Sequence, residues 1–211
     1  MDDDALPPGG EPVVEVDVDA SWDAWTPQDI AARLAGAADL AWAVAGGWAV
    51  DLFLGRATRE HEDLEIVVPG DEFGVVRAVL EPELTFWVVG AGHRWPGDDA
   101  AALAALHQTW GATADGLYRI DVFRDLGDRR TWVSRRDPAL ARPWPDVVRR
   151  DAEGIPYLAP EVVLHYKAKL TRDKDEADFE ALLPELDAAA RTWLRQALEH
   201  LHPDHPWLTR V

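Results

Sequence analysis

The chain has 211 residues, of which 47% are hydrophobic, and it contains no cysteine. This composition is sufficient for a buried core, and it excludes disulfides and thiolate metal sites. No apolar run approaches the roughly 20 residues that a membrane-spanning helix needs, and no segment is typical of a signal peptide, so we expect a soluble, cytoplasmic protein without membrane contact.

The formal net charge is −18, and half of it comes from the first 30 residues, which contain nine acids and no lysine or arginine. Residues 1–20 include Pro7-Pro8-Gly9-Gly10 and have little to bury, so we expect this acidic N-terminus to be mobile. The rest of the chain carries −9. An acidic body repels nucleic acid and attracts cations, which favours a small polycationic partner over tRNA or DNA. The alternative is that the acidity serves solubility only.

Residues 42–68 change pattern twice. Apolar residues at 42 and 44 indicate a strand, residues 48–54 have helical spacing, and residues 64–68 are again typical of a strand. Gly46 and Gly47 precede the helix, so its first N–H groups are unpaired and an anion such as phosphate can approach them. A tight turn without a ligand is the alternative interpretation of a glycine pair.

Asp63 and Glu65 are two residues apart at the start of the second strand. Side chains with this spacing point to the same face, roughly 6.6 Å apart at Cα. Two converging carboxylates can bind one divalent cation, and hard oxygen ligands suit Mg²⁺. Although an acid-X-acid pattern is also common at solvated strand edges, its combination with the glycine turn predicts a joint metal and phosphate site.

A longer pattern joins these features: Gly46-Gly47, then Gly55-Arg56-x-Thr58-Arg59-x-His61-x-Asp63-Leu64-Glu65. It resembles the polymerase β-like nucleotidyltransferases, most of all the branch of aminoglycoside 2″-O-nucleotidyltransferases and lincosamide nucleotidyltransferases. The resemblance is dense over residues 44–68. It implies an α+β fold with a mixed twisted sheet, followed by a helical C-terminal part. These antibiotic enzymes usually have Asp at the second metal position, where this chain has Glu65.

The region 119–150 is basic, with nine arginines and five aspartates. Arginine forks match phosphate oxygens, so Arg135 and Arg136 are candidates for holding a nucleotide. The alternative is that most of these arginines are paired with the local aspartates on the surface.

Residues 117–123 alternate between apolar and polar side chains, which predicts a strand. Asp121 is expected on its polar side, together with Arg119 and Phe123. The resemblance implies a later strand with an acid that shares the metals and accepts the proton of the acceptor hydroxyl, and Asp121 is the best candidate, with Asp115 second. An ordinary half-exposed aspartate paired with Arg119 is the alternative.

Three helices are predicted after residue 158, the first beginning at Pro160. All three lysines of the chain lie here, at 167, 169 and 174. The resemblance implies that a C-terminal lysine reaches back over the nucleotide, which makes Lys167 and Lys169 candidates. The alternative is a solvated helix with weak Lys–Glu pairs.

The predicted organisation is an N-terminal segment 1–20, a nucleotidyltransferase domain 21–150 and a helical part 151–211. The expected catalytic and metal-binding residues are Asp63, Glu65 and Asp121. The expected nucleotide-binding residues are Gly46, Gly47, Trp48, Arg59, His61, Arg135, Arg136, Lys167 and Lys169.

The resemblance implies that two Mg²⁺ ions and ATP take part in the reaction. The implied reaction is transfer of AMP to a hydroxyl of a small polar acceptor, such as an aminoglycoside or lincosamide antibiotic. Two alternatives stay open: a toxin-type nucleotidyltransferase that modifies RNA or protein, and a nucleotide-binding protein without catalysis.

Overall fold

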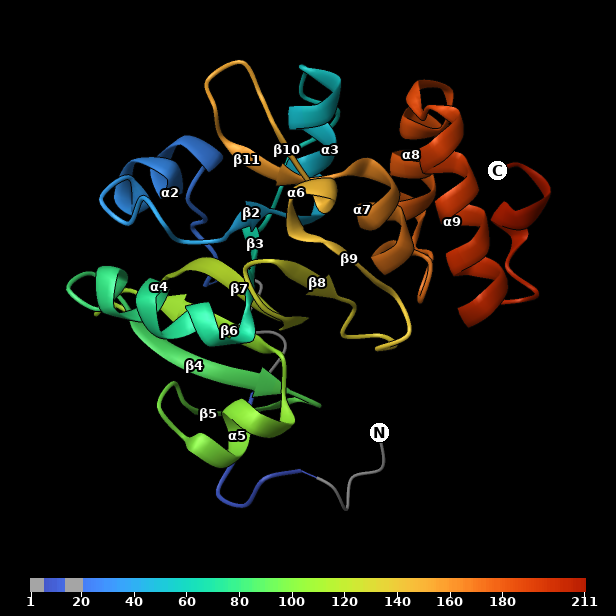
Figure 1. The fold of residues 1–211 in the computed structure, drawn as a ribbon. Coiled ribbons are helices and arrows are strands. Elements are labelled where there is room, and N and C mark those ends of the chain that lie inside the picture. Colours follow the sequence, from blue (N-terminus) through green and yellow to red (C-terminus); the bar gives the residue numbers. More distant parts are fainter. Residues whose placement is uncertain (1–5, 14–20) are drawn as a thin grey trace.

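The computed structural model describes residues 6–13 and 21–211 (Figure 1). Residues 6–13 lie against the edge of the sheet, because the indole Nε1 of Trp95 donates to the carbonyls of Pro7 and Pro8, at 3.2 Å each. Of the segment 1–20, for which mobility is predicted, residues 1–5 and 14–20 lie outside the described residues.

The strands of the described residues form one mixed sheet of eleven strands. Nine of them follow the order β1-β5-β4-β6-β7-β3-β2-β11-β10, and β8 and β9 continue from the end of β7. Their bounds are β1 Glu11–Pro12, β2 Ala43–Val44, β3 Glu65–Pro69, β4 Thr85–Gly90, β5 His93–Pro96, β6 Gln108–Ala112, β7 Tyr118–Gly127, β8 Thr131–Val133, β9 Ala141–Pro143, β10 Val148–Arg150 and β11 Pro156–Leu158.

Helices surround this sheet, and the C-terminal helices α8 and α9 lie at the opposite end of the molecule from α2 and α4 (Figure 1). The α-helices are α2 Pro27–Leu34, α3 Gly46–Leu54, α4 Phe73–Leu80, α5 Ala100–Ala105, α6 Trp144–Val147, α7 Pro160–Lys167, α8 Asp173–Leu182 and α9 Ala188–Leu201. Short 3₁₀ turns are η2 Gly70–Glu72, η3 Leu183–Glu185 and η4 Pro206–Thr209. The predicted α+β class with a mixed sheet and a helical C-terminal part is confirmed.

The centre of the sheet consists of β3 and β7, which run parallel, with Glu65 opposite Asp121. Both strands bury alternate apolar residues, among them Ile66, Ile120 and Val122, which are fully buried. Because side chains alternate along a strand, the residues between them point to the other face. This alternation places Glu65 and Asp121 on one face of two adjacent strands.

Helix α3 is held against this centre at both of its ends. Before it, β2 pairs with β3, and the N–H of Ala45 donates to the carbonyl of Glu65 at 2.8 Å. After it, Gly55 adopts a left-handed conformation with φ of 65° and ends the helix. The N-terminus of α3 therefore lies beside the first residue of β3.

The C-terminal helices share the core of the sheet domain. Helix α7 packs against α3, α8 and α9, and the main hydrophobic core includes Val44 and Ile66 together with Leu164, Phe179 and Leu198. The predicted boundary near residue 150 falls in the hairpin of β10 and β11, and β11 pairs in parallel with β2. Both chain segments thus contribute strands to the same sheet.

Three local interpretations of the sequence differ from the structure. The alternative of Asp121 as an ordinary half-exposed residue is wrong, since it is only 3% exposed, with β3 paired on one side of it and β6 on the other. The sequence also predicts Lys169 on the first C-terminal helix, but α7 ends at Lys167. Asp63 lies just before β3 rather than on it.

In the part of the chain that the structure describes, no helix combines the length and apolar character that crossing a membrane requires.

Candidate active site

Three carboxylates meet at the start of the two central strands. Oxygens of Asp63, Glu65 and Asp121 all lie within 4.8 Å of one another. The pairing of β3 with β7 brings Glu65 beside Asp121, and Asp63 reaches them from the preceding loop. The structure thus brings together the three residues predicted from the sequence as metal ligands, 58 positions apart at the extremes of the set.

Burial and repulsion from neighbouring carboxylates raise the pKa of Glu65 and of Asp121. Burial raises the pKa of Glu65, and the neighbouring Asp63 raises it further, while Lys167, Arg135 and Arg172 act in the opposite direction. The pKa of Asp121 is well above its ordinary value, first because of burial and then because of Glu65. A hydrogen bond of 2.6 Å from the Gln108 amide to Oδ2 of Asp121 lowers this pKa and so offsets part of the increase.

The donor set fits a divalent metal. Oδ1 of Asp121 is buried and has no hydrogen-bond partner among the described residues, although a buried acceptor normally has one. A cation bound between the three carboxylates would satisfy this oxygen and remove the repulsion that raises the two pKa values. Mg²⁺ is commonly bound by one or two carboxylates together with substrate phosphates and waters, and this cluster offers such ligands.

The glycine pair is required by close contacts to the same cluster. Gly46 has φ of 58°, and a Cβ atom there would overlap Oε2 of Glu65. A Cβ atom on Gly47 would overlap a guanidinium nitrogen of Arg59 and lie 2.5 Å from Nδ1 of His61. The first turn of α3 therefore faces the carboxylates and the loop before them without intervening side chains.

Asp51, which the sequence pattern does not single out, holds the loop between α3 and β3. Its side chain is 7% exposed; Oδ1 accepts from the backbone N–H of Thr58 at 2.9 Å and from its hydroxyl at 2.5 Å. Oδ2 accepts from Nε2 of His61 at 2.7 Å. Trp48 packs over the other side of this imidazole, with ring centroids 4.6 Å apart. The signal in the sequence is an acid in the middle of an otherwise apolar helix.

The same loop is tied to the C-terminal helices by ion pairs. The guanidinium of Arg59 lies 3.6 Å from Asp178, and Lys174 lies 3.5 Å from Glu62. Asp178 is buried and also pairs with Lys167. Arg59 and His61, two expected nucleotide-binding residues, thus contact Asp178 and Asp51 in this structure.

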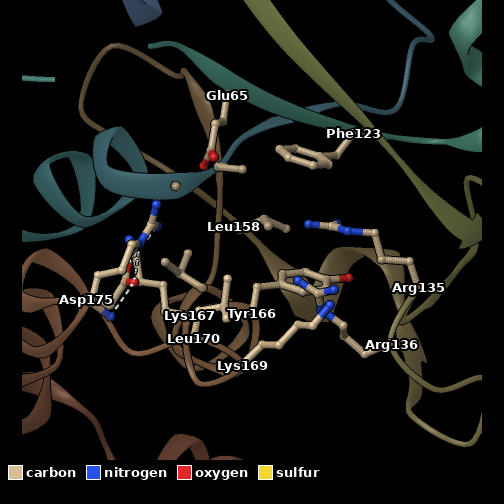
Figure 2. A pocket seen from close by; sticks show the side chains of 14 residues that line it. Glu65, Phe123, Arg135, Arg136, Leu158, Tyr166, Lys167, Lys169, Leu170 and Asp175 are labelled. Carbon is tan, nitrogen blue, oxygen red and sulfur yellow. Dashed lines mark hydrogen bonds and ion pairs between the residues drawn. The ribbon is translucent and has the colours of Figure 1, made fainter. Parts of the chain in front are cut away.

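A cavity of about 170 Å³ adjoins the carboxylates (Figure 2). Its wall combines the beginning of α3, the site face of β3 and β7, the segment 135–136 and the end of α7. Figure 2 shows Glu65 on one side of it, with Arg135, Tyr166 and Arg136 on the other. The cavity therefore connects the expected metal-binding group with the expected nucleotide-binding group.

Arg135 and Arg136 differ in their surroundings. The guanidinium of Arg135 pairs with buried Asp125 and lies between the rings of Phe123 and Tyr166, 4.3 and 3.8 Å from their centroids. Arg136 has no carboxylate within ion-pair distance in residues 6–13 and 21–211, and burial and Arg135 lower its pKa. Arg136 is thus the more available cation at the cavity.

The two lysines also differ. Lys167 pairs with Asp175 at 3.0 Å and with Asp178 at 2.8 Å, so its charge is balanced within the protein. Lys169 lines the cavity beyond the end of α7, and the structure shows no ion pair for it among the described residues. Between these two, Lys169 is the one whose ammonium is free for a ligand.

Residues 28–87 match a family model described as aminoglycoside-2″-adenylyltransferase. The resemblance to the nucleotidyltransferases is confirmed. A 2″-aminoglycoside nucleotidyltransferase from Escherichia coli is 45% identical over 38 residues, which are 18% of this chain and 22% of the relative. A protein of the same name from Klebsiella pneumoniae gives the same values. The chain therefore aligns with about a fifth of the length of these curated relatives.

Two solved structures share the fold over most of their length. ANT(2″)-Ia in complex with adenylyl-2″-tobramycin has a TM-score of 0.54 at 17% identity, covering 82% of this chain and 97% of that one. The lincomycin-bound lincosamide adenylyltransferase LnuA has a TM-score of 0.51 at 16% identity, covering 82% and 98%. At such identity the likeness shows the nucleotidyltransferase fold, and the chemistry depends on the site.

Proposed function

We propose that this protein is a magnesium-dependent nucleotidyltransferase that transfers AMP from ATP to a hydroxyl of a small polar acceptor. The observation that carries the proposal is the convergence of Asp63, Glu65 and Asp121 within 4.8 Å, beside a helix N-terminus that has no side chains in its first two positions. Both features line or adjoin one cavity. Together they form a site for a metal-bound polyphosphate.

The carboxylates would hold two Mg²⁺ ions, which neutralise the phosphate oxygens and polarise the attacking and leaving groups when bound. Asp63 and Glu65 supply ligands from the loop and β3, and Asp121 supplies them from β7. The first N–H groups of α3 donate to phosphate oxygens. Arg136 and Lys169 balance the remaining negative charge from the other side of the cavity.

In this proposal Asp121 takes the proton of the acceptor hydroxyl. Its Oδ2 is held by Gln108, whereas its Oδ1 is without a hydrogen-bond partner among the described residues. The hydrogen bond from Gln108 fixes this side chain, and positioning of this kind supplies part of the rate enhancement.

The acceptor is proposed to be a cationic small molecule of the aminoglycoside or lincosamide kind. The chain after residue 30 carries −9, which favours cations. The matched relatives are named for aminoglycosides, and one fold neighbour is named for lincosamides. Several arginines of the basic region are already paired with acids, as Arg129 is with Glu72 and Arg142 with Glu161, which weakens the case for an RNA acceptor.

The test is product formation. Purified protein, Mg²⁺ and each of the four nucleoside triphosphates are incubated with a panel of aminoglycosides and lincosamides, and mass spectrometry is used to detect a drug that has gained one nucleotide. Asp63→Asn should lose at least roughly a hundredfold in rate, since it removes a metal ligand. Asp71→Asn, an exposed aspartate just after β3, is the matched control and should retain the wild-type rate. Absence of product with every drug and nucleotide would contradict this acceptor class.

A further inference from the structure

A second cavity of about 430 Å³ lies at the other end of β7 from Asp121. Its walls come from α4, α5 and residues 124–126 of β7, elements that are labelled in Figure 1. Along β7, the last residue that pairs with β6 is Phe123, and the last that pairs with β3 is Asp125. Strand β8 pairs with the last residues of β7, Leu126 and Gly127, and the cavity beside residues 124–126 is not part of the site described above.

A buried cation that forms no ion pair among the described residues lines this cavity, and Asp121 acts on it only through its electrostatic field, raising its pKa against the effect of burial. Arg124 is only 5% exposed, and its guanidinium donates to the hydroxyl of Thr109 and, at 2.6 Å, to the carbonyl of Leu106. Both acceptors are neutral, and among the described residues no carboxylate lies within ion-pair distance of it. Burial lowers the pKa of Arg124 to about 10, so the group is still charged at neutral pH. A guanidinium has five N–H donors, and only two acceptors are provided.

The other charged groups of the cavity do not compensate this charge. Asp125 is the one acid in its wall, and its carboxylate already accepts from Arg135, from Trp132 at 2.5 Å and from Tyr166 at 2.8 Å. Arg77 also lines the cavity, but its charge is balanced by Glu81 at 3.1 Å, and His107 contributes an imidazole. The excess positive charge of the cavity is therefore that of Arg124. A buried charge normally has a counterion, so the cavity has a positive excess.

We propose that this cavity binds a small organic anion, with its oxyanion at Arg124 and an apolar body against Phe73, Leu103 and Leu126. The apolar residues line the same cavity, and the ring of Phe73 lies 5.1 Å from the guanidinium carbon of Arg124. The ligand class is thus a carboxylate or phosphate monoester that carries an apolar group. This site is independent of the proposed transfer reaction and does not require a nucleotide.

The test is calorimetric titration of the full-length, metal-free protein with phenyl phosphate and with benzoate. We expect dissociation constants roughly between 10 μM and 1 mM for at least one of them. Benzyl alcohol, which has the apolar ring without the charge, should bind at least about tenfold more weakly. Failure of both anions to bind up to roughly 10 mM would overturn the proposal.

Variants locate the binding. Gly74 lines the cavity, and no atom lies within 4 Å of the position that a Cβ would take there. Gly74→Leu therefore adds an apolar side chain at the cavity wall while Arg124 is kept, and it should weaken binding at least about tenfold. Arg124→Met should also weaken anion binding at least about tenfold. If Arg124→Met does not fold, the result with Gly74→Leu tests the proposal by itself. Arg33→Met on α2, outside the cavity, is the control. If Arg136→Met removes binding while Gly74→Leu retains it, the anion occupies the nucleotide cavity and the proposal is wrong.

Discussion

Glu65 and Asp121 lie opposite each other on the parallel strands β3 and β7, and both carboxylates point to the same face of the sheet. The charge of Glu65 adds to burial in raising the pKa of Asp121. A buried acid beside a half-buried one destabilises the metal-free fold at neutral pH unless the two share protons or a cation. The closeness of these two carboxylates therefore lowers the stability of the metal-free protein, and a bound metal would offset this loss.

Asp121→Asn should stabilise the metal-free protein. Because the pKa of Asp121 is raised in the folded state, the folded protein binds more protons than the unfolded chain, and its stability falls as pH rises from about 4 through the raised pKa. The variant removes this loss, so at pH 7 its unfolding free energy should be higher on the order of 1 kcal/mol, or roughly 2–4 °C in Tm. Thermal unfolding at several pH values in EDTA measures this.

With Mg-ATP bound, the wild type should have a higher Tm than Asp121→Asn, the reverse of the order expected without metal. It raises the Tm of the wild type by binding only the folded state, and it should leave Asp121→Asn nearly unchanged. If the wild type shows no metal-dependent shift at any pH between about 5 and 8, a range spanning the usual optimum of stability, the carboxylate cluster does not bind metal.

Gly46→Ala should damage both fold and activity. The left-handed φ and the close approach to Glu65 leave no space for a methyl group, so we expect a loss of about 1–3 kcal/mol in unfolding free energy and a large loss of transferase rate. Gly36→Ala is the matched control, since nothing lies within 4 Å of its Cβ position. Equal stability of the two variants in urea titrations would show that the contact with Glu65 relaxes freely.

Asp51→Asn should lower catalytic efficiency at a distance from the reacting atoms. The amide cannot accept at both oxygen positions, so either Thr58 or His61 loses its partner and the loop that carries Asp63 loosens. We expect kcat/KM to fall roughly tenfold or more, with a stability loss of about 1–3 kcal/mol.

Thr58→Val serves as the graded control for Asp51, because it removes the hydroxyl bond and keeps the backbone bond. Its effect on kcat/KM should be smaller than that of Asp51→Asn. Steady-state kinetics with ATP and the acceptor varied in turn separate a loss in kcat from a loss in KM. A wild-type kcat/KM for Asp51→Asn would exclude a positioning role.

Arg135→Met should mainly lower the stability of the protein, whereas Arg136→Met should mainly raise the KM for ATP. Arg135 is the buried partner of Asp125, so its loss leaves an uncompensated carboxylate and should cost about 3–5 kcal/mol in stability. Arg136 has no ion pair among the described residues, so its loss should cost less than about 0.5 kcal/mol but raise the KM for ATP roughly tenfold. Chemical denaturation combined with steady-state kinetics distinguishes the two; a KM effect confined to Arg135→Met would contradict the assignment.

Local patterns were sufficient to predict the segment around the site. The glycine pair, the helix after it and the acids before a buried strand are all encoded within residues 44–68, and the structure has α3 and β3 in these places. The resemblance to nucleotidyltransferases depends on the same short segment. Periodicity, glycine positions and residue spacing are properties of consecutive residues, so they can be read without knowing what packs against them.

Tertiary structure decided which distant side chains meet. The sequence offered Asp121 and Asp115 as the third acid, and only the register of β7 on β3 places Asp121 beside Glu65. It proposed Arg135 and Lys167 as ligand-binding cations, but packing gives them Asp125 and the acids of α8 as partners. The role of Asp51 depends on its contacts with Thr58 and His61, and that of Arg124 on its contacts with Thr109 and Leu106. Burial and charge pairing depend on contacts between separate elements, and the pattern of a single segment does not contain them.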